Sequence, residues 1–411
     1  MIYLNYMKYE VIKKCRISKK KDFITVAKFK KMYLTGIFPK NKNQKILALP
    51  FEVVFSRESK LLQLKHNYDP KLLYGVNYGY KSGLNPIMID HLKRKSNFLK
   101  KKINFKRNNF VLDIGSNDGT YLNFFKGLNL YGIDPSIIKF KKYYKKYIKK
   151  LPLFFEDGYE VLKNKKFNLI SAIAMFYDLK DPVGFLKKIK KILDQNGIFH
   201  IEVAYLPEII KNFSYDTFCQ EHYEYYSLLS LDYLCKKANM KIIDFGFNEI
   251  NGGSIWLNIS HKKSKFDESK KLKKQILYER AKKIHIPSTY KEYFKKVFDH
   301  GSKLHSIIKK INNLGKNIYG LGASTKGNVL LQNSKLDNNF IAGIFDVNRD
   351  KFNKFTPHSK IKIIDEKKLK HIKVDFILLL TWHFGKKIIK KIRKINKNIK
   401  IIIPFPKIKI I

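Results

Sequence analysis

Cysteine, acidic residues and long apolar runs are all scarce in this chain of 411 residues. Its three cysteines are Cys15, Cys219 and Cys235, and their wide spacing gives no disulfide framework, so we expect a reducing compartment. The first residues lack the apolar segment of a secretion signal, and no apolar run approaches the ~20 residues that a membrane helix needs. We therefore expect a cytoplasmic protein without membrane insertion.

The shortage of acidic residues leaves a formal net charge of +50, because 34 Asp and Glu stand against 84 Lys and Arg. The lysines are spread along the whole length, with one dense run at residues 141–150. A nucleic-acid-binding arm would concentrate charge and often interleave aromatic residues. We therefore expect no nucleic-acid partner, and keep an RNA-binding protein on this scaffold as an alternative. The positive field favours anionic substrates, such as a nucleotide diphosphate.

A chain of this length is too long to fold around one hydrophobic core, so we expect two or three domains. The hydrophobic residues, 44% of the total, are enough to fill their cores. From residue 110 to about 201, strand and helix signals alternate, which predicts an α/β fold with a doubly wound parallel sheet. The strands are expected at 110–114, 130–133, 151–155, 168–174 and 197–203. The helices are expected at 120–127, 136–148, 158–163 and 182–193.

The last third of the chain predicts a second Rossmann-like lobe. Residues 265–313 look like Lys-rich helices broken near Ile286-Pro287, and a new strand-turn-helix begins at Asn317. Further strands are expected at 341–346, 361–364, 373–380 and 399–403. Gly320 and Gly322, followed by Lys326, would hold a phosphate at a helix N-terminus, although a purely structural turn has the same pattern.

Residues 110–120, with the sequence FVLDIGSNDGT, predict a buried strand, a tight turn from Gly115 to Gly119 and the start of a helix. Such a unit forms a nucleotide-sized crevice at the carboxyl edge of a parallel sheet. Asp134 ends the next expected strand, nineteen residues after Gly115, where its carboxylate can accept both hydrogen bonds of a ribose diol. An ordinary strand-to-helix turn with incidental acids is the alternative.

The residues of this turn indicate which nucleotide it binds. Dinucleotide sites need glycine where the backbone closes on a pyrophosphate, but Asn117 and Asp118 stand there. Their bulk and negative charge suit a cationic cofactor without phosphate, which favours S-adenosylmethionine (SAM). We expect Asp113 to hold its ammonium group and Asp134 its ribose. Phe155, expected at the end of the third strand, is placed to flank the adenine or simply to fill the core.

Residues 215–226 carry the densest mixture of polar and aromatic side chains, including the adjacent Glu221 and His222. An imidazole titrates near neutral pH, about 6.5 when unperturbed, and a carboxylate beside it raises its basicity, as a general base requires. A structural Glu-His pair is the alternative. Residues 74–83 include Tyr78 and Tyr80 among glycines, and this loop would line a ligand or form a packed turn.

These features occur together in a known family. The matching segments, in chain order, are Tyr78-Gly-Tyr-Lys-Ser-Gly83, Val111-Leu-Asp-Ile-Gly-Ser-Asn-Asp-Gly119, Gly132-Ile-Asp-Pro135, Glu202-Val-Ala-Tyr205, Asp216-Thr217, Glu221-His222, Tyr226-Ser227, Asn251-Gly-Gly-Ser254, Gly322-Ala-Ser-Thr-Lys-Gly-Asn328 and Leu378-Leu-Leu-Thr-Trp382. Through them the chain resembles, over nearly its full length, the sugar C-methyltransferases of deoxysugar biosynthesis.

The resemblance implies a zinc-binding-like lobe at 1–86, a class I methyltransferase lobe that binds SAM at 87–260, and helices with a C-terminal Rossmann-like lobe at 261–411. It implies methylation of a carbon beside the ketone of a nucleotide-linked 4-keto sugar, through an enolate. The implied base is His222, assisted by Glu221 and Tyr80. The implied cofactor residues are Asp113, Gly115, Asn117, Gly119, Asp134 and Phe155. The implied substrate residues are Tyr78, Tyr205, Asn251, Lys326 and Asn328.

The chain departs from this family at several positions. The two Cys-x-x-Cys pairs of the zinc lobe become Cys15-Arg-Ile-Ser18 and Ser56-Arg-Glu-Ser59, and serine is a poor zinc ligand, so we expect no zinc. Cys219-Gln-Glu-His222 replaces Tyr-His-Glu-His, a histidine of some members is replaced within 176–179, and Asn251 replaces another. Methylation of oxygen or nitrogen on a nucleotide sugar or related small molecule is therefore the alternative.

Overall fold

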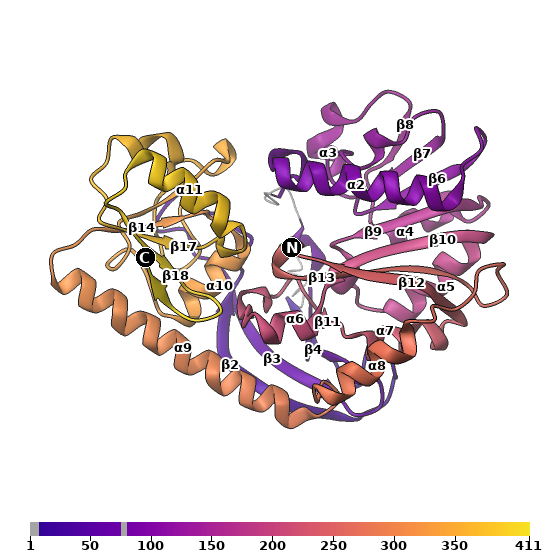
Figure 1. The fold of residues 1–411 in the computed structure, drawn as a ribbon, viewed down its shortest axis with the longest axis horizontal. Helices are drawn as coiled ribbons and strands as arrows, with labels where there is room; N and C mark the ends of the chain where they lie inside the picture. The colour runs from indigo at the N-terminus through magenta and orange to yellow at the C-terminus, as the bar shows by residue number, and fades with distance from the viewer. Residues whose placement is uncertain (1–7, 75–79) are drawn as a thin grey trace, which may run out of the picture.

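The computed structural model describes residues 8–74 and 80–411, and it shows three lobes that each contain a β-sheet (Figure 1). None of the helices in these residues is long and apolar enough to cross a membrane. In the N-terminal lobe, four antiparallel strands pair in the order β11-β4-β3-β2, and β1 pairs with β5. Their bounds are β1 Tyr9–Val11, β2 Phe23–Tyr33, β3 Ala48–Ser56, β4 Leu62–Leu64, β5 His66–Tyr68 and β11 Glu224–Tyr225, and helix α1 spans Pro70–Leu73.

The middle lobe contains the doubly wound sheet that the alternation predicted, in the order β12-β13-β10-β9-β6-β7-β8. All its neighbouring strands run parallel except β13, which is antiparallel to both β10 and β12. The strands are β6 Phe110–Ile114, β7 Asn129–Ile133, β8 Ile148–Leu151, β9 Phe167–Ile173, β10 Leu193–Ala204, β12 Met240–Asn248 and β13 Ser254–His261. The helices are α2 Pro86–Ile103, α3 Ile137–Phe140, α4 Phe155–Leu162, α5 Pro182–Ile192, α6 Leu206–Lys211 and α7 Leu228–Lys237.

Three of the elements predicted in this lobe have other bounds in the structure. The third strand ends at Leu151, because Pro152 has no N–H for the ladder, and Phe155 begins α4 instead of ending the strand. The helix expected at 120–127 is only a single 3-10 turn at Leu122–Phe124, followed by Gly127 in a left-handed conformation. The helix expected at 136–148 is likewise reduced to α3 and a 3-10 turn at Lys141–Tyr143.

The C-terminal lobe is the second Rossmann-like sheet that the sequence predicted, in the order β16-β15-β14-β17-β18-β19. Its strands run parallel apart from β19. They are β14 Ile318–Leu321, β15 Gly343–Asp346, β16 Ile363–Asp365, β17 Phe376–Leu379, β18 Lys400–Ile403 and β19 Lys409–Ile410, with helices α10 Thr325–Asn333 and α11 Gly385–Ile395. The Lys-rich segment before it forms α8 Leu272–Ala281 and α9 Pro287–Asn313, so the predicted break at Ile286-Pro287 is confirmed.

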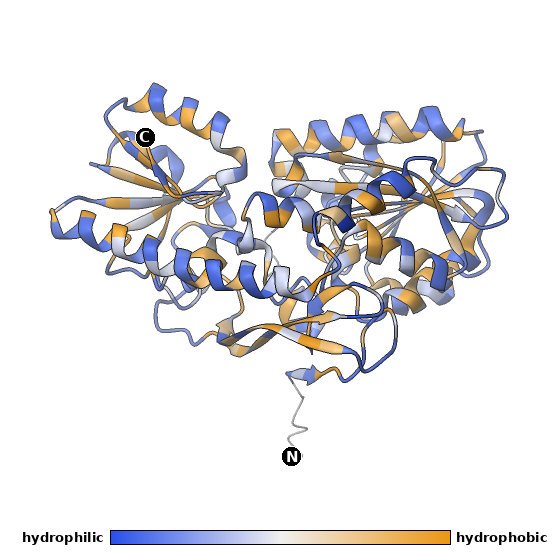
Figure 2. Ribbon diagram, turned by 60° about the horizontal axis from the view of Figure 1, so that its bottom comes forward, coloured by the Kyte–Doolittle hydropathy of each residue, from blue (hydrophilic) through white to orange (hydrophobic). Residues whose placement is uncertain are grey.

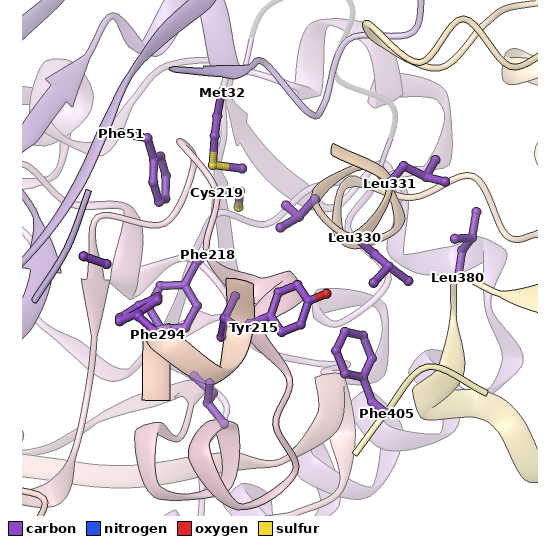
Figure 3. Close-up of a cluster of buried hydrophobic side chains, with 14 of the residues drawn as sticks. Met32, Phe51, Tyr215, Phe218, Cys219, Phe294, Leu330, Leu331, Leu380 and Phe405 are labelled. Atoms are coloured by element: carbon purple, nitrogen blue, oxygen red, sulfur yellow. The ribbon is translucent and has the colours of Figure 1, made fainter. Parts of the chain in front are cut away.

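One continuous hydrophobic core joins the three lobes. Along α9, hydrophilic and hydrophobic residues alternate (Figure 2), and the buried ones recur at helical spacing, from Tyr290 and Phe294 to Leu304 and Ile308. Figure 3 shows how this core combines strands β2 and β3, residues 215–219, α9 and α10; its labelled side chains are Met32, Phe51, Tyr215, Phe218, Cys219, Phe294, Leu330, Leu331, Leu380 and Phe405. The segment just before His222 is therefore held by all three lobes.

The four positions where the resembling family carries zinc thiolates lie together and are fully or almost fully buried. The Cys15 Sγ lies 3.2 Å from the Ser59 Oγ, and the Ser59 hydroxyl donates to the Ser56 Oγ at 3.0 Å. The Ser56 hydroxyl in turn donates to Asp22 at 2.8 Å, while the Ser18 Oγ accepts from the backbone N–H of Lys20. Hydrogen bonds thus satisfy these groups, and no cluster of three or more His, Cys, Asp or Glu in residues 8–74 and 80–411 is placed to hold a metal ion.

We predict that the purified protein contains far less than one zinc per chain and that a chelator leaves its melting temperature unchanged, because serine hydroxyls do not replace thiolates as ligands. Elemental analysis and thermal unfolding with and without EDTA measure both quantities. The variant Ser18→Cys/Ser56→Cys/Ser59→Cys restores four thiols in one cluster, and it should bind zinc. Stoichiometric zinc in the unmodified chain would contradict the prediction.

Candidate active site

A cavity of about 460 Å³ opens at the carboxyl ends of β6 and β7. This is the edge of a doubly wound sheet where ligands bind. Its walls include residues that the sequence proposed for the cofactor and one that it proposed for catalysis: Tyr80, Asp113, Gly115, Asn117, Asp134 and Phe155. The structure therefore brings together five of the six expected cofactor residues and Tyr80.

Asp113 lies at the base of this cavity and is 4% exposed. Its Oδ1 accepts a hydrogen bond from the Ser171 hydroxyl at 2.6 Å. Burial, together with the nearby Asp134, raises the pKa of Asp113 to about 7, since no cation offsets its charge. A ligand ammonium group would supply that cation, so this carboxylate fits the amino-acid end of SAM.

The remaining walls also fit SAM. The two Asp134 oxygens accept backbone N–H bonds from Asn117 at 2.9 Å and Ser136 at 2.6 Å, and each keeps a second lone pair for a ribose hydroxyl. Gly115 has a φ of 72°, and a Cβ there would lie 2.9 Å from Met175, so the backbone approaches the cavity closely. Phe155 contributes to an apolar wall beside Phe154, as an adenine requires.

Asn117 and Asp118 act differently from what the sequence suggested. The Asn117 amide accepts from the Ser82 N–H at 2.9 Å and donates to the Tyr80 carbonyl at 3.2 Å. The Asp118 carboxylate accepts from the Gly83 N–H at 2.8 Å. Both side chains thus bind the backbone of residues 80–83 and are themselves almost completely buried. The cofactor turn holds the loop that carries Tyr80, instead of presenting a second acid to the ligand.

Gly119 does not line the cavity. Its φ is 75°, and a Cβ there would lie 2.8 Å from the Tyr144 ring, so glycine is required for packing at this position. The prediction that Gly119 contacts the cofactor is therefore replaced by a structural role for it. Tyr78 lies outside the described residues.

His222 is part-exposed and is not itself one of the residues that line the cavity. Tyr223, the next residue, and Asp178 both line the cavity, and the His222 ring packs edge-on against Tyr177 with centroids 4.5 Å apart. Its Nδ1 lies 2.7 Å from the Thr217 carbonyl oxygen. A carbonyl only accepts, so Nδ1 carries the proton and Nε2 keeps its lone pair. Burial lowers the pKa of His222 to about 4, which leaves the imidazole neutral at physiological pH.

Glu221 does not pair with His222 in the described part of the chain. Its carboxylate accepts from the Thr35 hydroxyl at 3.2 Å and is buried, and its backbone carbonyl accepts from the Tyr74 hydroxyl at 3.1 Å. Burial raises the pKa of the Glu221 carboxyl. The expected carboxylate partner of the imidazole is thus replaced by the Thr217 carbonyl, because adjacent side chains leave the backbone in different directions.

A second polar group lies near His222, where the middle and C-terminal lobes meet. The Lys326 Nζ donates to the Asn251 carbonyl at 2.6 Å, and Lys326 also contributes to the lowered pKa of His222. The buried Asp216 accepts from the Trp382 indole N–H at 2.8 Å. The sequence comparison matched Asp216 and Trp382 to motifs without giving them a role. Because 166 positions separate the two residues in the chain, only the folded structure reveals the hydrogen bond between them.

Two residues expected to bind substrate are buried elsewhere. Tyr205 is 2% exposed and donates to the Glu279 carboxylate at 2.6 Å, and Glu279 also accepts the first N–H groups of α7. Asn328 is 1% exposed and donates to the Thr35 carbonyl at 2.7 Å. Their polar groups are satisfied within the protein. The predicted substrate contacts of both residues are therefore replaced by hydrogen bonds that connect distant segments of the chain.

Known proteins resemble the chain over different extents. The family model "Methyltransferase domain" matches residues 87–244, and the model "C-methyltransferase C-terminal domain" matches residues 249–406. C-methyltransferase NovU of Streptomyces niveus is 26% identical over 408 residues, which cover 97% of each chain. A tRNA U34 carboxymethyltransferase of Campylobacter lari is 31% identical over 123 residues, 28% of this chain and 42% of that protein. Among solved structures, plantazolicin methyltransferase BpumL with SAH is 14% identical, covering 41% of this chain and 82% of its own, with a TM-score of 0.34.

We predict that Asp113→Asn weakens SAM binding about 10- to 100-fold, because an amide cannot neutralise an ammonium ion. Since the raised pKa of Asp113 is about 7, its carboxyl holds a proton below that pH, and the wild-type affinity should fall as the pH drops below 7. Calorimetry across pH measures both effects. An Asn variant that binds SAM as tightly as the wild type would contradict this assignment.

We predict that Tyr205→Phe destabilises the protein by about 1–3 kcal/mol, because the buried Glu279 loses a hydrogen-bond donor. The KM for the methyl acceptor should stay unchanged, since the hydroxyl is not available to a ligand. Denaturant unfolding and steady-state kinetics separate the two readouts. A KM raised tenfold at unchanged stability would restore Tyr205 to the substrate site.

Proposed function

Because the chain belongs to the family of SAM-dependent C-methyltransferases, we propose that it methylates the carbon beside the ketone of a nucleotide-linked 4-keto deoxysugar. The observation that carries this proposal is the neutral His222, which keeps its Nε2 lone pair and directly precedes the cavity residue Tyr223. A carbon nucleophile needs a base to remove its proton, whereas the ketone makes that proton acidic enough for an imidazole.

His222 takes the proton from this carbon onto Nε2 and leaves an enolate. The Thr217 carbonyl accepts from Nδ1–H at 2.7 Å, so it fixes the tautomer and stabilises the imidazolium that forms. Tyr177 packs edge-on against the imidazole ring and limits its rotation. A general base that is held in place in this way contributes about 10²–10⁴-fold to the rate.

The cofactor end of the cavity supports the other half of the reaction. Asp113 would hold the SAM ammonium group, Asp134 the ribose and Phe155 the adenine. When bound, SAM supplies an electrophilic methyl group on its sulfonium. The walls around Phe155 and Met175 are largely apolar, which disfavours water beside the reacting carbon.

The substrate's diphosphate is assigned to the junction with the C-terminal lobe. Lys326 offers a cation at the start of α10, and Ser324 caps the N-terminus of that helix, whose N–H groups favour an anion. Asn251, with a φ of 57°, stands beside Lys326 and is the other residue kept from the expected substrate set. The strongly positive net charge adds to the attraction for a nucleotide diphosphate.

We predict that His222→Ala lowers kcat at least about 10²-fold, because the variant lacks the base. SAM should still bind, because the residues proposed to hold the cofactor are unchanged. In the wild type, activity should fall as the pH drops through about 4, where the lowered pKa of His222 places its protonation. The assay is SAM-dependent methylation of a panel of nucleotide-linked 4-keto sugars, with the new methyl group located by NMR.

His305→Ala is the matched control, because its Nδ1 also bonds a backbone carbonyl, that of Ser334 at 3.0 Å, in the C-terminal lobe. This variant should keep full activity. If His222→Ala also stays fully active, the enolate mechanism is wrong. A methyl group found on oxygen or nitrogen would establish the alternative acceptor.

A further inference from the structure

Asp178 is an acid inside the cavity to which the sequence assigned no role. It ends the 3-10 turn η4 Phe176–Asp178 that follows β9, and it lines the same cavity as Asp113 and Tyr80. The turn contacts β11, and the Tyr223 N–H donates to the Tyr177 carbonyl at 2.8 Å. Asp178 is therefore held against the segment that carries His222.

In residues 8–74 and 80–411, no cation pairs with Asp178. Its Oδ1 is enclosed by protein and takes no hydrogen bond from any residue that the structure describes. The groups that act on it electrostatically or by hydrogen bonding are neutral or acidic: Tyr74, Cys219, Glu221, Tyr223 and Glu224. Arg16 pairs with Glu224. Lys180 and Lys188 also line the cavity, but neither is among the groups that shift the pKa of Asp178.

A carboxylate in this setting loses hydration without gaining a counter-ion. Burial, and then the negative charge of Glu221, raise the pKa of Asp178 well above its usual value, against the effect of the Tyr74 hydrogen bond. This shift favours the protonated, uncharged form of Asp178. A carboxylic acid that stays neutral at pH 7 can donate a hydrogen bond to a developing oxyanion.

We propose that Asp178 is a further catalytic residue, a carboxylic acid that donates a hydrogen bond to the ketone oxygen of the substrate while His222 removes the neighbouring proton. This inference rests on the proposed function and adds the group that stabilises the enolate.

The step that Asp178 assists is the enolisation of the substrate. The C–H bond breaks, and its electron pair forms the carbon–carbon double bond of the enolate. The π electrons of the ketone move to its oxygen, and the proton is held on the His222 Nε2. The negative oxygen then accepts the hydrogen bond from Asp178, which keeps its own proton. The base, His222, begins without a proton on Nε2 and acts on the α-carbon. The acid, Asp178, begins with a proton and acts on the ketone oxygen.

Enolisation is measurable without SAM as exchange of the substrate's α-proton for deuterium in D₂O. The substrates are dTDP-, UDP-, GDP- and CDP-linked 4-keto-6-deoxyhexoses, tested with the full chain. We expect Asp178→Ala to slow exchange and methylation about 10²–10³-fold, the usual loss for one oxyanion donor. Asp178→Asn keeps an N–H donor, and its rates should stay within about tenfold of wild type.

The pH profile separates this role from a structural one. Wild-type kcat/KM should fall at alkaline pH as Asp178 loses its proton, whereas Asp178→Asn should lack this alkaline fall and keep the acidic fall caused by His222. Asp232→Asn is the matched control. It changes an acid of the same lobe that is 9% exposed and bonds Lys236 at 2.7 Å, and it should leave the profile unchanged.

Three results would overturn the inference alone: Asp178→Ala near full activity, Asp178→Asn as slow as a folded Asp178→Ala, or the same alkaline fall in wild type and Asp178→Asn. If the wild type neither exchanges nor methylates any sugar of the panel, the proposed function fails and the inference fails with it. Unchanged thermal unfolding of each variant is checked first, and a poorly folded Asp178→Ala leaves the decision to the Asn variant and its pH profile.

Discussion

The site depends on the hydrophobic core that all three lobes share. Residues 215–219 of the middle lobe pack between strands β2 and β3, helix α9 and helix α10 (Figure 3). Because these side chains are almost fully buried, the chain that follows them has little freedom to move. His222 itself contacts Thr217 and Tyr177 of the middle lobe, while the segment before it is held partly by the other two lobes. Glu221 and Asn328 bond Thr35 of the N-terminal lobe at the same junction.

Three titratable side chains of the site are largely withdrawn from water without an ion-pair partner in the described part of the chain, and this burial shifts their pKa values. It raises the pKa of Asp113 and Asp178 and lowers that of His222, since in each case the charged form loses hydration. The consequences differ with position. A cationic ligand would complete Asp113, the neutral imidazole can accept a proton, and the raised pKa of Asp178 favours the protonated form that donates a hydrogen bond. One physical effect thus prepares three different chemical roles.

The fold was predictable to the extent that its signals are local. The strands around Asp113 and Asp134, the glycine turn between them, and the helix break at Ile286-Pro287 follow from apolar runs and from residues with restricted backbones. The third strand was misplaced because the apolar Phe154 and Phe155 outweighed Pro152 in the prediction, although proline ends the ladder. Side-chain direction was less predictable, and Asn117 shows why: its partners, Tyr80 and Ser82, come from a distant loop.

By itself, the sequence determined the order of strands and helices and the acids at the strand ends, because these depend on hydrophobic period and turn chemistry within short stretches. Only the tertiary structure decided which polar groups remain available to a ligand. Tyr205 and Asn328 are satisfied by Glu279 and Thr35, whereas the Asp178 Oδ1 has no hydrogen-bond partner in the part of the chain that the structure describes. Hydrogen-bond satisfaction is a property of neighbours in space, and those neighbours are contributed by segments far apart in the chain.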